Sequence, residues 1–173
     1  MIIETERLLL REMTEDDFEA LFAVLGDPVN MKHYPYIFDE ERVRNWISRN
    51  TERYRTFGFG LWAVCLKETG EMIGDCGLTM QNINNVIRPE IGYHIRADRQ
   101  RKGYAREAAE AVRDWTFRTL PFNEIYSYMT SGYGPSQMTA VTWGCRLVDE
   151  YEDEGVPHRV FRITRDEWEA LMK

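Results

Sequence analysis

Three consecutive stretches carry the hydrophobic pattern of strands joined by short turns. Residues 61–66 are continuously apolar, and the turn sequence Lys-Glu-Thr-Gly separates them from a second apolar stretch at 72–80. An asparagine-rich connection at 81–85 leads to a third stretch at 86–95. Strands joined so closely pair with their chain neighbours, so the pattern predicts an antiparallel meander.

In much of the remaining chain, apolar residues recur at the spacing of a helix. Apolar residues recur every three to four positions after Thr14-x-x-Asp17, which is typical of a capping box at a helix start. Further helices are predicted at 39–54, from the basic loop to about Arg118, at 135–143, and after a second capping box at Thr164-x-x-Glu167. Other strand-like runs lie at 8–10, 124–129, 148–151 and 159–163. The strand at 124–129 follows a strand and a helix, which predicts a right-handed parallel crossover within one α/β domain spanning 1–173.

The composition is that of an ordinary globular domain. The 173 residues include 43% hydrophobic and 29% charged side chains, which argues against disorder. A net charge of −7 argues against a nucleic-acid partner and suits an amine-bearing substrate. No apolar run is long enough to cross a membrane. Three cysteines without a disulfide framework or a signal peptide favour the cytoplasm, and we expect a monomer or homodimer.

One short segment reverses the charge of the protein locally. Gln100-Arg101-Lys102-Gly103-Tyr104-Ala105-Arg106 lies between the strand at 86–95 and the following helix, and from Arg96 to Arg106 five basic residues face a single Asp98. The first N–H groups of a helix lack intrahelical partners, and the macrodipole adds partial positive charge there. The arrangement predicts an anion site with phosphate as its usual occupant. An ordinary solvated helix entrance is the alternative.

The same segment matches the pattern Gln/Arg-x-x-Gly-x-Gly/Ala through Gln100, Gly103 and Ala105. It resembles the pyrophosphate-binding motif of the GNAT superfamily of acetyl-CoA-dependent N-acetyltransferases. The string Glu-Ile-Gly-Tyr-x-Ile from Glu90 resembles the branch that acts on ribosomal-protein amino termini. This resemblance implies an α/β, GNAT-like fold with a central, mostly antiparallel sheet of six to seven strands. A parallel, splayed pair would lie in the middle of the sheet, with helices on both faces.

The resemblance also implies acetyl-CoA as the cosubstrate and no metal. The loop would hold the pyrophosphate, and the pantetheine arm would run beside the strand at 86–95, with the reacting carbon close to Tyr93 or His94. The cofactor-binding residues expected on this basis are Tyr93, His94, Ile95, Gln100, Arg101, Lys102, Gly103, Tyr104, Ala105 and Arg106. Gly103 has no side chain, which permits close approach of the backbone to the ligand.

Two residues of the strand at 86–95 are candidates for the general base that removes a proton from the acceptor amine. Glu90 stands where histone-acetylating members of the superfamily carry a general-base glutamate, and partial burial would raise its pKa towards a useful value. The alternative is a structural carboxylate at the strand end, paired with Arg88 or another arginine. His94 lies on the same face by strand alternation and titrates near neutrality, so it is a rival base or a structural histidine.

On the leaving-group side, the ribosomal branch has Asn-x-x-Ser at the start of a helix, with serine as the proposed acid. Ser136 matches that serine, while Tyr133 replaces the asparagine. Tyr133 is a second candidate donor, and Ser136 is equally a candidate for a helix-terminus hydrogen bond. Many superfamily members use a tyrosine in this helix, but the aligned position is Ala140.

Other chemistries find little support. Cys76 and Cys145 lack a recognisable His–Asp constellation, the three histidines lack metal-ligand spacing, and neither a Walker loop nor a Gly-x-Gly-x-x-Gly motif occurs. The aromatic stretches at 31–38 and 57–62 are candidate acceptor walls or core, and the acidic run at 149–154 is a steering surface or a solvated hairpin. We expect direct acetyl transfer to a primary amine, either a small amine or a peptide amino terminus, in a ternary complex. A non-catalytic acyl-CoA-binding module is the alternative.

Overall fold

The computed structural model describes residues 2–132 and 134–173. Within these ranges, one mixed sheet has the strand order β1-β2-β3-β4-β5-β6-β8-β7. Its strands are β1 (Ile2–Glu4), β2 (Leu8–Arg11), β3 (Leu61–Leu66), β4 (Met72–Ile83), β5 (Val86–Ile95), β6 (Glu124–Thr130), β7 (Arg146–Asp153) and β8 (Val156–Thr164). The helices are α1 (Phe18–Leu25), α2 (Glu40–Phe57), α3 (Tyr104–Thr119), α4 (Gly134–Thr142) and α5 (Arg165–Leu171).

The predicted α/β class, the meander and the parallel central pair are confirmed, but the predicted strand count of six to seven is wrong. The sheet has eight strands. The strand missing from the prediction is β1, whose three residues pair with β2. A strand of three residues is too short to display the alternation by which strands are recognised.

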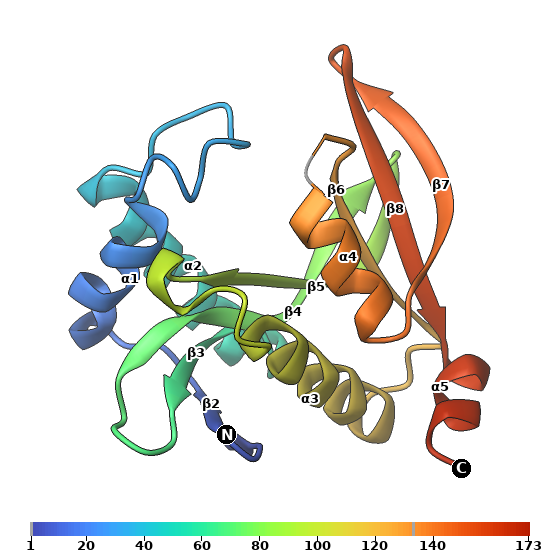
Figure 1. Cartoon of the computed structure of the whole chain (residues 1–173), viewed down its shortest axis with the longest axis horizontal. Coiled ribbons are helices and arrows are strands. Elements are labelled where there is room, and N and C mark those ends of the chain that lie inside the picture. The colour runs from blue at the N-terminus through green and yellow to red at the C-terminus, as the bar shows by residue number, and fades with distance from the viewer. Residues whose placement is uncertain (1, 133) are drawn as a thin grey trace.

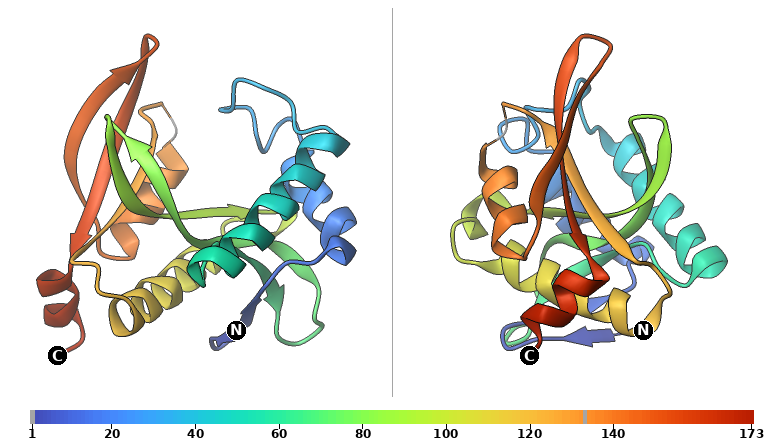
Figure 2. Two further views of the ribbon diagram at one scale, coloured as in Figure 1. Left: turned by 180° about the vertical axis from the view of Figure 1, so that it is seen from behind. Right: turned by 90° about the vertical axis from the view of Figure 1, so that its right-hand side faces the viewer.

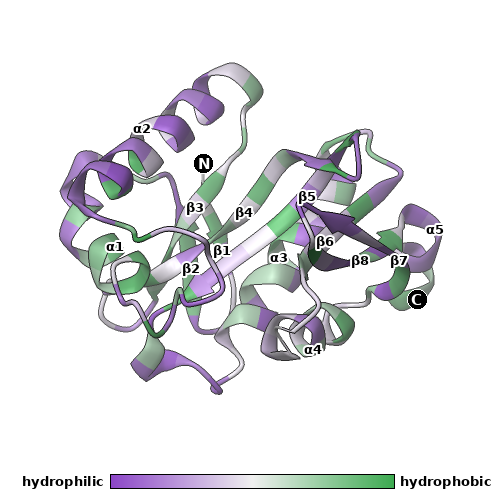
Figure 3. Ribbon diagram, turned by 90° about the horizontal axis from the view of Figure 1, so that it is seen from above, coloured by the Kyte–Doolittle hydropathy of each residue, from purple (hydrophilic) through white to green (hydrophobic). Residues whose placement is uncertain are grey.

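Helices cover both faces of the sheet (Figures 1 and 2). One face packs against α1 and α2 through a hydrophobic cluster that includes Leu21, Ile47 and Ala63. The other packs against α3 through a larger cluster that includes Val112 and Trp62. Neighbouring residues of β3 thus point to opposite cores, as strand alternation requires. The outer side of α2 is hydrophilic, whereas its inner positions are hydrophobic (Figure 3).

Both predicted capping boxes are present. Thr14 accepts from the backbone of the first helical turn, and the Asp17 side chain accepts from the Thr14 N–H. Thr164 and Glu167 make the same reciprocal pair at the start of α5. Such caps satisfy backbone donors that a helix leaves unpaired and are worth about 1 kcal/mol each.

The two sides of β5 differ sharply. Its antiparallel pairing with β4 runs through ten successive residue pairs, from Ile83↔Val86 to Gly74↔Ile95. Its parallel pairing with β6 comprises only Glu90↔Tyr126. Beyond Glu90 the two strands separate, with α4 beside the gap and the β7–β8 hairpin rising from the far side of the sheet (Figure 1). No helix in the described part of the chain is long and apolar enough to span a bilayer.

Candidate active site

The predicted anion loop leads directly into α3. Arg101 and Gly103 both adopt left-handed backbone conformations, with φ of 62° and 83°. Gly103 is the N-cap of α3 and brings no side-chain cap, so the N–H groups of the first turn from Tyr104 are left for a ligand or water. This backbone shape and the helix dipole favour an anion at this point.

Arg7 of the loop between β1 and β2 braces this segment. Its Nη1 donates to the carbonyl of Lys102 at 2.9 Å, and its Nε pairs with Glu107 of α3 at 2.7 Å. The guanidinium also lies 4.3 Å from the centre of the Tyr104 ring. Arg7 lies 95 residues from Lys102 in the sequence, and its flanking strand gave no signal of this role.

The basic residues near the loop fall into two groups. Arg96 pairs with Glu71 and Asp98, and Arg106 pairs with Glu110. Arg101 and Lys102 are exposed and form no ion pair with any residue that the structure describes. The charge that remains for a bound anion is therefore concentrated on Arg101 and Lys102.

Gln100, expected to contact the cofactor, has its side chain turned towards the end of β5. Its Nε2 donates to the Ile95 carbonyl at 2.9 Å and to the Asn30 side chain. Asn30 donates to the same carbonyl at 3.2 Å. Gln100 thus ties the loop to the end of β5 and to the segment after α1.

Tyr93 brings β5 and α4 together. Its hydroxyl donates to the Ser136 carbonyl at 3.2 Å, across the gap where β5 and β6 separate. Ser136 is half-buried at the start of α4, and its hydroxyl makes no hydrogen bond in the described ranges. Ile95, the last residue of β5, is buried in the core. Tyr133, the second candidate donor, lies outside the described residues.

Glu90 lies in the middle of β5, at its single pairing with β6, and is only 8% exposed. Burial raises the pKa of this carboxyl from 4.5 to about 8, although the backbone N–H of Tyr128 stabilises the charged form in part. Arg88, the alternative partner, instead pairs with Glu124 at 3.5 Å. The carboxyl leans along the strand, because a Cβ placed on Gly92 would lie 3.4 Å from Glu90 Oε1. Glu90, Gly92 and His94 thus share one face of β5.

His94 belongs to a hydrogen-bonded chain that sequence reasoning missed. Its Nδ1 lies 2.8 Å from Asp75 Oδ1, and its Nε2 lies 2.9 Å from the Tyr34 hydroxyl. Asp75 is fully buried on β4 and also accepts from Trp46 Nε1 of α2 at 2.9 Å. The sequence did carry one signal, because Asp75 interrupts an otherwise apolar strand.

The aromatic stretches at 31–38 and 57–62 lie in different environments. In the 57–62 stretch, Phe59 and Trp62 belong to the hydrophobic core, whereas Phe57 is exposed. In the 31–38 stretch, Tyr34 and Tyr36 line a cavity of about 210 Å³ together with neighbouring residues of that stretch and with residues at the end of α1. Tyr34 also lies close enough to Glu90 and Asp75 for their charges to add to the rise in its pKa that burial causes. This segment therefore stands over the same face of β5 as Glu90.

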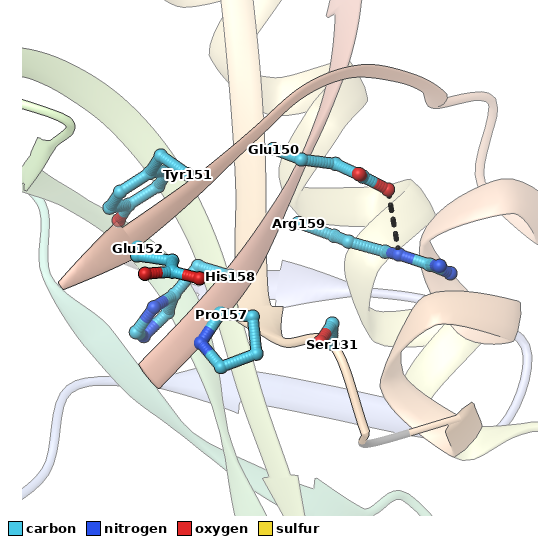
Figure 4. Close-up of a pocket in the computed structure, with 7 residues that line it drawn as sticks. All are labelled: Ser131, Glu150, Tyr151, Glu152, Pro157, His158 and Arg159. Atoms are coloured by element: carbon cyan, nitrogen blue, oxygen red, sulfur yellow. Dashed lines mark ion pairs between the residues drawn. The ribbon is translucent and has the colours of Figure 1, made fainter. Parts of the chain in front are cut away.

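A second cavity, of about 250 Å³, lies on the β7–β8 hairpin (Figure 4). Glu150 pairs with Arg159 across the hairpin at 3.0 Å, and the Tyr151 and His158 rings stack at 5.2 Å. Ser131 lines the same cavity from the end of β6. The predicted acidic run is thus part of a hairpin, and one of its carboxylates already has a cation.

Cysteine and metal chemistry have no visible centre in the described residues. Cys65, Cys76 and Cys145 are all free and buried, and burial raises the pKa of the Cys76 and Cys145 thiols. A thiol in that state is a poor nucleophile. Within residues 2–132 and 134–173, no group of three His, Cys, Asp or Glu side chains is placed to hold a metal ion.

Comparison with known proteins finds relatives over most of the chain. A family model described as the acetyltransferase (GNAT) domain matches residues 7–146. The sequence is 35% identical over 129 residues to the uncharacterized protein YkkB of Bacillus subtilis (strain 168), covering 74% of this chain and 75% of that protein. It is 32% identical over 135 residues to the uncharacterized N-acetyltransferase p20 of Bacillus licheniformis, covering 76% and 75%.

Solved structures share the fold at lower identity. A GNAT-family acetyltransferase from Bacillus anthracis matches with a TM-score of 0.83 and 24% identity, covering 96% of this chain and 99% of that one. The ribosomal α-N-protein acetyltransferase RimL, solved in complex with coenzyme A, matches with a TM-score of 0.79 and 17% identity, covering 96% and 99%. Ribosomal-protein acetyltransferases are thus one of several kinds of acetyltransferase among the structural neighbours.

Proposed function

The chain belongs to the GNAT family of acetyltransferases, and on that premise we propose that it moves the acetyl group of acetyl-CoA to a primary amine by direct transfer in a ternary complex. The family uses acetyl-CoA, and the protein is an acyltransferase. The single observation that carries the proposal is the separation of β5 from β6 beyond Glu90, with the anion loop at one end and a buried carboxyl at the other.

The cofactor would enter from the α3 side. Its pyrophosphate would accept hydrogen bonds from backbone N–H groups at the start of α3, with Arg101 and Lys102 supplying charge. Its pantetheine arm would run along the outer edge of β5 from Ile95 towards Tyr93, where β6 leaves the backbone groups unpaired. An extended arm pairs with such an edge as an added strand would.

The proposed proton acceptor is Glu90. An alkylamine with a pKa of about 10.4 reaches the site as an ammonium ion, and its nitrogen must lose a proton before it attacks the thioester carbon. A carboxyl whose pKa stands at about 8 takes that proton more readily than an ordinary glutamate would. Attack by the neutral amine forms the C–N bond, and collapse of the intermediate breaks the C–S bond.

Ser136 is the proposed donor to the departing thiolate. Its backbone is fixed against β5 by the Tyr93 hydroxyl, which places the start of α4 beside the proposed path of the pantetheine arm. A thiolate with a pKa of about 8.5 leaves without strong assistance, so we expect this hydroxyl to contribute less than Glu90. The acceptor would approach from the opposite face, between Glu90 and the segment that carries Tyr34.

The test is acetyl-CoA binding by calorimetry combined with release of the CoA thiol in the presence of a panel of alkylamines and peptides with free amino termini. We expect micromolar binding and turnover with at least one amine. Tight acetyl-CoA binding without thiol release or acetylated product from any amine would support the non-catalytic acyl-CoA-binding module instead. Failure to bind acetyl-CoA would contradict both.

A further inference from the structure

A buried chain of hydrogen bonds leads from the interior of the sheet to the proposed acceptor side. Asp75 lies on β4 directly opposite His94 on β5, and His94 in turn contacts Tyr34 on the segment after α1. Tyr34 and His94 are 60 positions apart in the sequence. Three separate parts of the fold therefore meet in one continuous contact, which the roles given above to Glu90 and Ser136 leave unused.

The donor and acceptor directions along these hydrogen bonds follow from Asp75, the most deeply buried of the three residues. The ionised Asp75 carboxylate can only accept, and it already accepts from Trp46 Nε1 through its other oxygen. His94 therefore donates its Nδ1 proton to Asp75, and the lone pair of a neutral imidazole stands on Nε2. The Tyr34 hydroxyl then donates to Nε2, so that the lone pairs of its oxygen are directed away from His94.

Those lone pairs lie near the proposed reaction centre. His94 and Glu90 share a face of β5, and the Glu90 carboxyl leans over Gly92 towards His94. The charges of Glu90 and Asp75 both act on the Tyr34 hydroxyl. Other titratable groups also face these three residues. Tyr36 and Tyr128 act on Tyr34, and Asp75 acts on Tyr54 and Cys76. His33 lies beside Tyr34, and burial lowers the pKa of its imidazole to about 4.

The chemistry of amide formation requires two proton acceptors. An acceptor ammonium has three N–H bonds and the amide product has one, so two protons leave the nitrogen. Glu90 takes one of them in the proposed function, on which this inference rests. We propose that Asp75, His94 and Tyr34 form a proton relay that takes the other, with the Tyr34 hydroxyl in contact with the acceptor nitrogen.

The step balances in protons and electrons. The acceptor nitrogen gives its proton to the Tyr34 oxygen as the Tyr34 O–H proton passes to His94 Nε2, and the buried Asp75 carboxylate stabilises the resulting imidazolium. After the product leaves, the proton returns through Tyr34 to water. Tyr34 is the catalytic residue of the relay, and His94 and Asp75 act through it.

Asp75→Asn tests the polarity of the relay with little change of shape. The asparagine oxygen still accepts from Trp46, and its amide now donates to His94 Nδ1, so the imidazole proton moves to Nε2 and the relay loses its acceptor. We expect kcat to fall by about 100-fold, which is typical of the loss of one proton-transfer group. Tyr34→Phe keeps the ring and removes the hydroxyl, and we expect a loss of the same order with unchanged acetyl-CoA affinity.

Asp17→Asn is the matched control. Asp17 is also a buried carboxylate, 7% exposed, and it pairs with Arg11 at 2.8 Å without a hydrogen bond to any member of the relay. We expect it to lower the melting temperature while leaving kcat within about twofold of wild type below the transition. A merely structural role for Asp75 would make the two variants behave alike.

Two further readouts separate the relay from the proposed function. Nitrogen-15 NMR of the unliganded protein should show His94 protonated on Nδ1 in the wild type and on Nε2 in Asp75→Asn. The dependence of kcat on the D₂O fraction should be curved in the wild type and closer to linear in Tyr34→Phe. A wild type that acetylates no amine contradicts the proposed function, whereas wild-type turnover that both variants retain, or an Nε2-protonated His94, contradicts the relay alone.

Discussion

The two edges of β5, one facing β4 and the other facing β6, differ in how completely they are paired. On the β4 side, ten residue pairs hold the strand in a fixed register, and the buried Asp75 has partners on both oxygens. On the β6 side there is a single pair, and the buried Glu90 has no charged partner among the residues described. The paired side fixes geometry, while the unpaired side leaves backbone groups and a carboxyl for chemistry.

The largest expected effect is the loss of folding stability with rising pH that follows from burying the Glu90 carboxyl without a charged partner. Folded Glu90 keeps its proton up to about pH 8, whereas the unfolded chain releases it near pH 4.5. Between these values the folded state binds more protons, so the stability present below pH 4.5 is lost as the pH rises through about 8. A shift of this size corresponds to about 4 to 5 kcal/mol in the free energy of unfolding.

Urea unfolding of wild type and Glu90→Gln across this pH range measures the effect. We expect the variant to be the more stable protein at high pH and the difference between the two to vanish towards pH 4.5. A difference that does not change with pH would mean that Glu90 is not the buried, unpaired acid that its surroundings indicate.

One register position of the β4–β5 pair holds two glycines whose surroundings differ in how closely they pack. Gly77 and Gly92 lie opposite each other in β4 and β5. A Cβ on Gly77 would lie 1.9 Å from the Gly60 carbonyl oxygen, which is backbone and cannot move aside, whereas a Cβ on Gly92 would meet its nearest atom at 3.4 Å. We expect Gly77→Ala to cost about 3 kcal/mol or more of unfolding free energy and Gly92→Ala less than about 1 kcal/mol.

Both values come from the same denaturation assay, so each glycine is the control for the other. Equal losses at the two positions would contradict the close packing of Gly77 against the Gly60 carbonyl.

The smallest expected effect is on acetyl-CoA affinity, at the basic loop that follows β5. Lys102 is exposed and has no ion pair in the part of the chain described, so Lys102→Ala should weaken acetyl-CoA binding by about 1 kcal/mol, or roughly fivefold. The loss should shrink as salt is added, because exposed charges are screened. Arg55→Ala is the control, since Arg55 already pairs with Glu52 far from the loop. Equal losses in both variants at calorimetric precision would exclude a specific role for Lys102.

The sequence predicted the features of the fold that depend on residues close together in the chain. The meander and the crossover follow from hydrophobic periodicity, and the helix start after Gly103 follows from a glycine in a short basic loop. Glu90 was singled out through the resemblance to the superfamily, and its role stays a prediction. The Asp75–His94–Tyr34 chain was missed, because it depends on the register of two strands and on where an irregular segment folds back. The bracing of the loop by Arg7 was missed for the same reason, since the contact joins residues 95 positions apart.

The measurement that tests the central claim most directly is the pH dependence of kcat/KM for wild type and Glu90→Gln with one alkylamine acceptor. If Glu90 is the base, the wild-type profile rises to a plateau near pH 8, set by the pKa of this carboxyl. The variant should be about 100-fold slower at neutral pH and should keep rising towards the pKa of the amine, so that the loss shrinks at high pH. Two profiles that bend at the same pH and differ by less than about threefold would contradict the account.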